Sequence, residues 1–164
     1  MGVDVRMAVD SDLPAILEIY NDAVLHTTAT ADLELQTMAV RAAWFHERRS
    51  AGFPVLVAEL GGSVVGWSSF GRFHSRAGYR FSVEDSVYVA ASSRRGGVGN
   101  ALLKPLIPMA ADMQMHAMIA LVDANNVASI SLHQRCGFVE AGRLRQAVYK
   151  FDRWNDILLL QCML

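Results

Sequence analysis

Hydrophobic and polar residues alternate along the first half of the chain in patterns typical of strands and helices. Leu13, Ile16, Tyr20 and Val24 fall at helical spacing behind the acidic start Asp10-Ser11-Asp12, so one apolar stripe of this helix should pack inward. The expected elements of this half are a strand over residues 3–9, a helix from that start to the loop at 27–30, a helix from the Thr37 cap to about Ser50, and strands over 55–60 and 64–70 joined by Gly61-Gly62.

The second half continues the same alternation after an aperiodic, arginine-containing loop over 71–79. Pro105 and Pro108 interrupt one helical pattern, and because each removes a backbone hydrogen bond, we expect a broken helix that restarts near Pro108 and ends before His116. The expected elements are a strand over 81–90, this broken helix from about Val98, a strand over 118–122, a helix from Asn126 through Arg135, and strands over 138–144 and 157–163 joined by a polar and aromatic segment over 145–155. The order β-α-α-β-β-β-α-β-α-β-β predicts a mixed α/β fold with helices covering a sheet.

Composition narrows the functional classes. The 164 residues predict one domain over 1–164, and the formal net charge of -1 excludes the broad basic surface that gathers nucleic acid or anionic lipid. The two cysteines, Cys136 and Cys162, are not in a CxxC pair and have no histidine cluster beside them, so we expect buried thiols and neither a metal site nor a disulfide scaffold. The sequence contains no signal-peptide pattern or membrane-length apolar run, which predicts a cytoplasmic protein.

Residues 86–103 form the most informative stretch, because they read as a strand, a glycine-rich turn with two arginines, and a helix start. Gly96, Gly97 and Gly99 permit a sharp turn that brings backbone N–H groups close to a ligand, and the following helix directs further N–H groups to the same place. The pattern therefore predicts an anion site, with an ordinary glycine-rich turn as the alternative.

The spacing of the glycines distinguishes three anion-binding templates. A Walker loop requires Gly-Lys-Ser/Thr, which is absent, and the dinucleotide fingerprint meets Leu102 where a small residue is needed. Arg94-x-x-Gly97-x-Gly99 instead resembles the acetyl-coenzyme A pyrophosphate loop of the GNAT acetyltransferase superfamily. The resemblance implies that acetyl-CoA is the cofactor, bound by a contact set made of Val87, Val89, Arg94, Arg95, Gly96, Gly97, Val98 and Gly99.

A second block, Asn126-x-x-Ser129 followed by His133 and Gly137-Phe138, is similar to the GNAT segment after the fifth strand. The resemblance implies that Asn126 and Ser129 contact the pantetheine or phosphate arm of the coenzyme and that His133 faces its sulfur. Simple helix capping is the alternative role for Asn126 and Ser129, and a solvated helix position is the alternative for His133.

A third block, residues 79–89, is similar to the GNAT branch that acetylates phosphinothricin, methionine sulfoximine and methionine sulfone. The likeness extends to Ile19-Tyr20-Asn21 and to the segment 150–156, and it implies a mixed, mostly antiparallel sheet and a homodimer. Residues 29–33 depart from the branch, because they lack the aromatic residue expected after the threonine loop.

Acyl transfer to an amine needs a base, a donor to the developing oxyanion and an acid for the leaving thiolate. We expect Glu84 to be the base, since Asp85 points to the opposite strand face. An irregular strand over 87–89 would supply an oxyanion N–H, and the acid is either His133 or Tyr88.

A small amino acid acceptor also needs a cation for its carboxylate. Arg80 matches the family position best, with Arg72 a weaker candidate, and Thr28 and Asn21 are placed to hydrogen-bond the polar head of the substrate. No cysteine or serine is placed as a nucleophile, so transfer should be direct, through a tetrahedral intermediate. Two alternatives remain, namely a GNAT enzyme for a protein N-terminus or polyamine, and a non-catalytic acyl-CoA-binding regulatory module.

Overall fold

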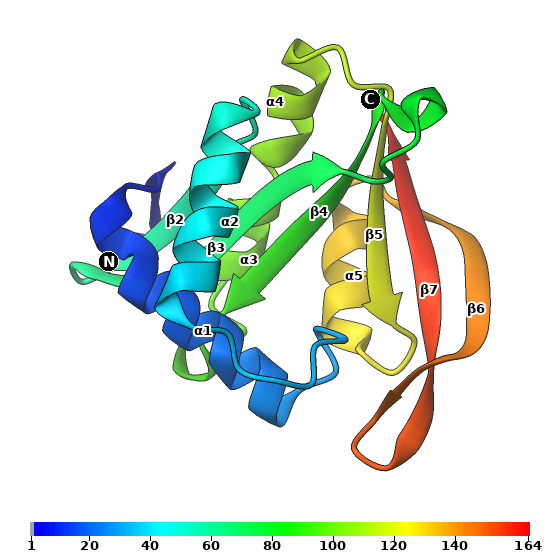
Figure 1. Cartoon of the computed structure of the whole chain (residues 1–164), viewed down its shortest axis with the longest axis horizontal. Helices are drawn as coiled ribbons and strands as arrows, with labels where there is room; N and C mark the ends of the chain where they lie inside the picture. Colours follow the sequence, from blue (N-terminus) through cyan, green and yellow to red (C-terminus); the bar gives the residue numbers. More distant parts are fainter. Residues whose placement is uncertain (1) are drawn as a thin grey trace.

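The computed structural model describes residues 2–164 and contains one twisted seven-stranded sheet (Figure 1). The strands follow the spatial order β1-β2-β3-β4-β5-β7-β6, and only β4 and β5 are parallel neighbours. Their bounds are β1 Asp4–Met7, β2 Val55–Leu60, β3 Ser63–Arg72, β4 Ser82–Val89, β5 Ala117–Asp123, β6 Val139–Lys150 and β7 Arg153–Met163. The predicted mixed α/β class with a mostly antiparallel sheet is confirmed.

Helices cover both faces of the sheet. Their bounds are α1 Leu13–His26, α2 Met38–Ser50, α3 Val98–Leu103, α4 Leu106–Asp112 and α5 Val127–Arg135. Helices α1 and α2 pack over one apolar core, which includes Ile16, Phe45 and Trp67, while α3 and α4 pack behind the sheet over a second one with Phe70 and Met118 (Figure 1). Among residues 2–164, no helix is long and apolar enough to cross a membrane.

The helix containing the two prolines is broken, as predicted, but it restarts earlier than expected. Helix α3 ends at Leu103 and α4 begins at Leu106, directly after Pro105. Pro108 therefore occupies the first turn of α4, where backbone N–H groups have no acceptor within the helix and a proline is tolerated.

The last two strands are longer than the pattern indicates. The segment over 145–155, which we expected to be a polar connection, forms most of a long β6–β7 hairpin whose turn is Phe151-Asp152. Both turn residues have positive φ, 54° and 55°, as a tight two-residue hairpin requires, but neither is the usual glycine. A register shift between Leu144 and Val148, where Gln146 has φ 49°, further obscures the alternation.

Candidate active site

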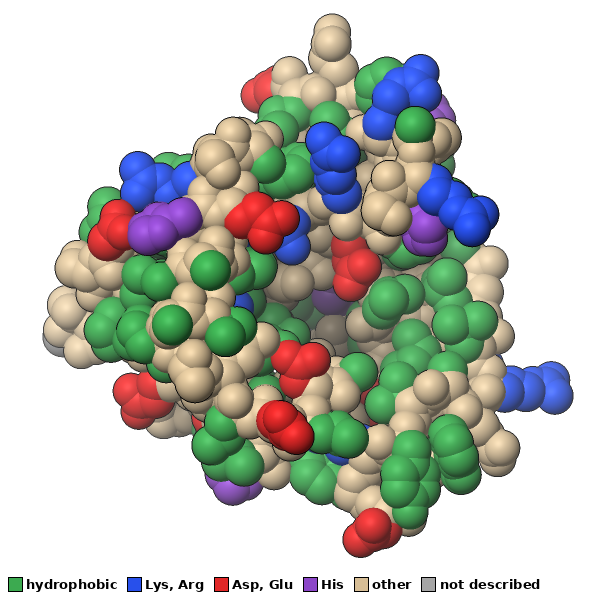
Figure 2. Space-filling model, viewed as in Figure 1, with side chains coloured by type: hydrophobic (Ala, Val, Ile, Leu, Met, Phe, Trp, Pro, Cys, Tyr) green, Lys and Arg blue, Asp and Glu red, His purple; other side chains and the backbone are tan. Residues whose placement is uncertain are grey.

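A hollow opens where the parallel strands β4 and β5 separate. The two strands pair only over Ser82–Glu84 and Ala117–Ile119, and Figure 2 shows the resulting depression between the α1–α2 side and the β5–β7 side of the molecule. Ala90 donates its N–H to Val65 O on β3, so the alternate residues Val87 and Val89 turn their backbone groups toward the gap. The expected irregularity of this strand is wrong, because β4 pairs with β3 in unbroken register; the divergence of β5 is what frees the backbone groups.

The glycine-rich turn lies at the end of β4 and leads directly into α3. Arg95 and Gly97 both have left-handed backbones, with φ 62° and 83°, and such residues next to right-handed ones gather N–H groups into an anion-binding concavity. Arg94 donates through Nε to Val89 O at 3.2 Å, and its Nη2 lies 3.8 Å from Asp22, so its side chain braces the turn against β4 and α1. A backbone concavity flanked by exposed Arg94 and Arg95 fits a pyrophosphate.

The three glycines of the turn have different structural roles. A side chain on Gly97 would meet no atom within 4 Å, so this position needs glycine for its backbone conformation. At Gly99 the added Cβ would instead lie 3.1 Å from Leu132 Cδ2, so glycine here permits close packing of α3 against α5. A Cβ added to Gly96 would have only Ser93 O within 4 Å, at 3.6 Å.

Glu84 and Asp85 point to opposite faces of the sheet, as the alternation predicts. Glu84 is half-buried on the α1–α2 face, and its side chain makes no hydrogen bond or ion pair within residues 2–164. Burial raises the pKa of Glu84, the neighbouring charge of Asp85 raises it further, and Arg48 partly opposes the shift. A carboxylate with a raised pKa is a stronger base than an ordinary glutamate, as a proton acceptor in catalysis needs to be.

Asp85 is buried on the other face, where it holds His133 of α5. Its Oδ2 lies 3.0 Å from His133 Nε2, and the opposite ring nitrogen, Nδ1, is 2.8 Å from Ser129 O. Since a carbonyl oxygen only accepts, Nδ1 carries hydrogen, and a further proton is held between Nε2 and Asp85. Burial alone lowers the pKa of His133, but the hydrogen bond and charge of Asp85, together with Ser129 O, raise it overall.

His133 is therefore a buried residue, only 4% exposed, and the alternative of a solvated helix histidine is wrong. Two protein acceptors fix its tautomer and ring orientation. Phe138 packs edge-on against the ring, with centroids 5.0 Å apart.

Tyr88, the other candidate acid, belongs to an aromatic cluster on the Glu84 face. Its ring stacks on Trp67 at 4.8 Å and meets the edge of Tyr20 at 5.2 Å. Burial and the neighbouring Tyr20 raise the pKa of Tyr88 above its usual range, which makes it a weaker proton donor than His133.

The helix after β5 begins with a side-chain cap. Asn126 Oδ1 accepts the Ser129 N–H at 3.1 Å, so the capping role that the sequence allowed for Asn126 is present. The Ser129 hydroxyl lies 3.4 Å from His133 Nδ1, which places Ser129 next to the buried histidine.

The expected acceptor-binding residues are not gathered in one place. Arg80 is exposed and stacks over Phe81, with Cζ 4.5 Å from the ring centroid, and the alternation of β3 places Arg72 on the face opposite Glu84. The side-chain amide of Asn21 is already hydrogen-bonded to the backbone of Gln36: Oδ1 accepts the Gln36 N–H at 2.9 Å, and Nδ2 donates to Gln36 O at 3.0 Å. Thr28 is half-buried in the α1–α2 connection.

A buried lysine from the distant β6–β7 hairpin holds the α1–α2 connection, a contact that the sequence pattern does not reveal. Lys150 is 4% exposed and donates to Thr30 O at 2.9 Å, while Tyr20 OH contacts Thr30 Oγ1 at 3.0 Å and donates to Asp32 at 2.6 Å. These bonds fix the loop that carries Thr28.

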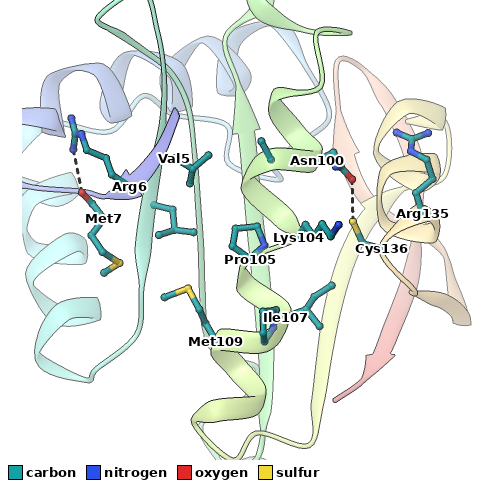
Figure 3. A pocket seen from close by; sticks show the side chains of 13 residues that line it. Val5, Arg6, Met7, Asn100, Lys104, Pro105, Ile107, Met109, Arg135 and Cys136 are labelled. Atoms are coloured by element: carbon teal, nitrogen blue, oxygen red, sulfur yellow. Dashed lines mark hydrogen bonds between the residues drawn. The ribbon is translucent and has the colours of Figure 1, made fainter. Parts of the chain in front are cut away.

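A separate groove of about 970 Å³ runs across the α3–α4 junction and includes Asn100, Lys104, Arg135 and Cys136 (Figure 3). Glu84 is not among its lining residues. Cys136 is half-exposed here, with Sγ 3.7 Å from Asn100 Oδ1, so the expectation that both cysteines are buried is wrong for Cys136 and confirmed for Cys162.

Comparison with known proteins tests the family resemblance. The family model of the acetyltransferase (GNAT) family matches residues 13–138. The chain belongs to the GNAT acetyltransferase family. It is 43% identical to an L-methionine sulfoximine/L-methionine sulfone acetyltransferase from Pseudomonas aeruginosa over 98% of this chain and 94% of that protein.

Two solved GNAT structures match this chain along nearly its whole length. A ribosomal-protein-alanine N-acetyltransferase from Brucella melitensis is 47% identical, with TM-score 0.96 over 98% of this chain and 99% of that one. A phosphinothricin acetyltransferase from Sinorhizobium meliloti in complex with acetyl-CoA is 34% identical, with TM-score 0.97 over 100% of this chain and 89% of that one. The resemblance to the GNAT superfamily and the expected acetyl-CoA dependence are thereby confirmed.

Proposed function

We propose that this GNAT enzyme transfers the acetyl group of acetyl-CoA to the α-amine of a small amino acid analogue such as methionine sulfoximine, methionine sulfone or phosphinothricin. The observation that carries the proposal is Glu84, an unpaired carboxyl group with a raised pKa on the strand that forms one side of the hollow. The relative from Pseudomonas aeruginosa, at 43% identity, supports the acceptor class.

Each candidate residue has a task that its position supports. Glu84 accepts the proton of the acceptor amine. His133, held protonated by Asp85, is the proton source for the leaving thiolate once one of its two ring N–H groups leaves its acceptor, Asp85 or Ser129 O. Val87 and Val89 offer backbone groups to the coenzyme arm, and Val87 N–H is a candidate oxyanion donor. Acetyl-CoA supplies the activated acetyl thioester when bound.

The coenzyme would be held by residues at the end of β4 and the start of α5. The turn from Arg94 to Gly99 binds its pyrophosphate, and Asn126 and Ser129 lie beside its arm. We further propose, as the sequence predicts, that residues 1–164 form a single catalytic domain, that the protein is a homodimer and that it acts in the cytoplasm.

An acetyl-transfer screen tests this function through release of free thiol. We expect thiol release with methionine sulfone, methionine sulfoximine or phosphinothricin, and background rates with spermidine. Absence of turnover with every free amino acid analogue would contradict the proposal.

A protein N-terminus is the second candidate acceptor, favoured by the ribosomal-protein-alanine acetyltransferase at 47% identity. A peptide with a free N-terminal alanine belongs in the same screen. Preference for the peptide over all free amino acids would favour this second function. It would show that the site needs no free carboxylate next to the amine, because a peptide has none there.

A further inference from the structure

The guanidinium of an α2 arginine lies directly over β3, beside Glu84. The α2 residue Arg48 is half-buried, and a Cβ added to Gly71 of β3 would overlap its Nη1 and Cζ atoms. Only glycine at position 71 leaves room for this guanidinium. The rings of Trp44 and Phe53 flank it, with Cζ 5.8 and 6.0 Å from their centroids.

Gly71 is the direct cross-strand partner of Glu84, which places the guanidinium of Arg48 next to the proposed base. Opposed residues of an antiparallel pair have side chains on the same face, about 4.5–5.5 Å apart at Cβ. Within residues 2–164, the side chain of Arg48 makes no hydrogen bond, and none of its nitrogens is within ion-pair distance of a carboxylate, Glu84 included. A half-buried cation and a half-buried carboxyl group thus stand side by side without pairing.

Burial disfavours the charged form of this arginine, because desolvation lowers the pKa of Arg48. The negative charges of Glu47 and Glu84 raise this pKa again, but only in part. The other nearby arginines are engaged or turned away. Arg49 lies 3.1 Å from Asp10, Arg80 stacks on Phe81, and Arg72 is on the opposite face. Arg41, on the same helix, packs its guanidinium on the rings of Tyr20 and Trp44, at 4.0 and 4.6 Å from their centroids. Arg48 is therefore the cation that lies next to Glu84 on the α1–α2 face.

An α-amino acid has an amine and a carboxylate on one carbon, so a protein that binds both needs a base and a cation as close neighbours. We infer that Arg48 receives the α-carboxylate of the acceptor through its guanidinium fork, while Glu84 takes the proton from the α-amine. The inference rests on the proposed function and names Arg48, in place of Arg80, as the residue that recognises a free amino acid.

The experiment compares methionine sulfone with 3-(methylsulfonyl)propan-1-amine, which has the same side chain but no carboxylate. Arg48→Met should lower kcat/KM for methionine sulfone about 10- to 100-fold, the usual effect of losing a charge-assisted hydrogen-bond pair, and leave the amine nearly unaffected. Arg48→Lys should recover part of the loss, because a lysine keeps the charge but not the fork. Arg49→Met, a neighbour on the same helix that pairs with Asp10, is the matched control and should leave both substrates unchanged.

Calorimetric titration with methionine sulfone provides a readout independent of turnover. Its Kd should rise by the same factor in Arg48→Met, and this titration decides the matter if the wild-type enzyme does not acetylate the amine. Thermal melting curves of all variants verify folding.

Three results would count against the inference. Equal losses on the two substrates, with the acid limb of both pH profiles moved upward, would mean that Arg48 acts only through the pKa of Glu84. An unchanged Kd for methionine sulfone in Arg48→Met would also overturn it. Wild-type enzyme that acetylates no free amino acid would overturn the proposed function itself, a separate and earlier failure.

Discussion

Glu84 and Asp85 are adjacent carboxylates on β4, yet they lie on opposite faces of the strand in different surroundings. Asp85 is bound to His133 at 3.0 Å and belongs to a buried pair that holds a proton in place. Glu84 has an arginine nearby but no partner, and burial raises its pKa. One face of the strand therefore holds a protonated histidine, while the other leaves a carboxyl group free to accept a proton.

Removing the free carboxylate should have the largest effect. Glu84→Gln is expected to lower kcat about 100-fold or more, because an amide cannot accept the amine proton. Steady-state thiol release measures the change. The melting temperature should barely move, since the side chain of Glu84 makes no hydrogen bond or ion pair within residues 2–164. Retained turnover would exclude Glu84 as the base.

Filling the space under Arg48 should have the next largest effect. In Gly71→Ala the new methyl group occupies the position of the guanidinium, so Arg48 must move away from Glu84. We expect KM for methionine sulfone to rise about tenfold while kcat falls less. Gly78→Ala is the control, because a Cβ there meets no atom within 4 Å. Equal KM values in the two variants would contradict this account.

Neutralising the paired carboxylate should shift the pH dependence of kcat on both sides. Activity needs Glu84 deprotonated and His133 protonated, so kcat rises through the raised pKa of Glu84 and falls through the raised pKa of His133. Asp85 raises both values, and Asp85→Asn should therefore move both limbs to lower pH. A pH profile under saturating substrates measures this shift. A basic limb that stays in place would remove His133 from the role of acid.

A change in the coenzyme turn should have the smallest effect, because it leaves both carboxylates intact. Gly97→Ala places a side chain at φ 83°, which costs about 1 kcal/mol and should weaken coenzyme A binding about fivefold. Calorimetric titration of coenzyme A measures it. The pH profile should keep both limbs, and a shifted limb would show that the turn also positions the acid or the base.

Local sequence was sufficient for most of the fold. Apolar spacing placed α1, α2 and the central strands, and the two prolines predicted the α3–α4 break, because these signals depend on the chemistry of neighbouring residues. The β6–β7 hairpin escaped prediction, since Phe151-Asp152 is not a usual turn pair and both strands carry exposed apolar residues such as Tyr149 and Trp154.

The family, the coenzyme turn and the opposite directions of Glu84 and Asp85 could also be predicted from the sequence, because a motif and a strand period of two are local properties. Which side chains meet depends instead on how distant segments pack in the fold. His133 lies 48 residues from Asp85 in the sequence, and Lys150 lies 120 residues from Thr30. Contacts at such sequence separations cannot be predicted from a local pattern. The same holds for Arg48, which lies beside Glu84 because Gly71, on a third element, leaves space for its guanidinium.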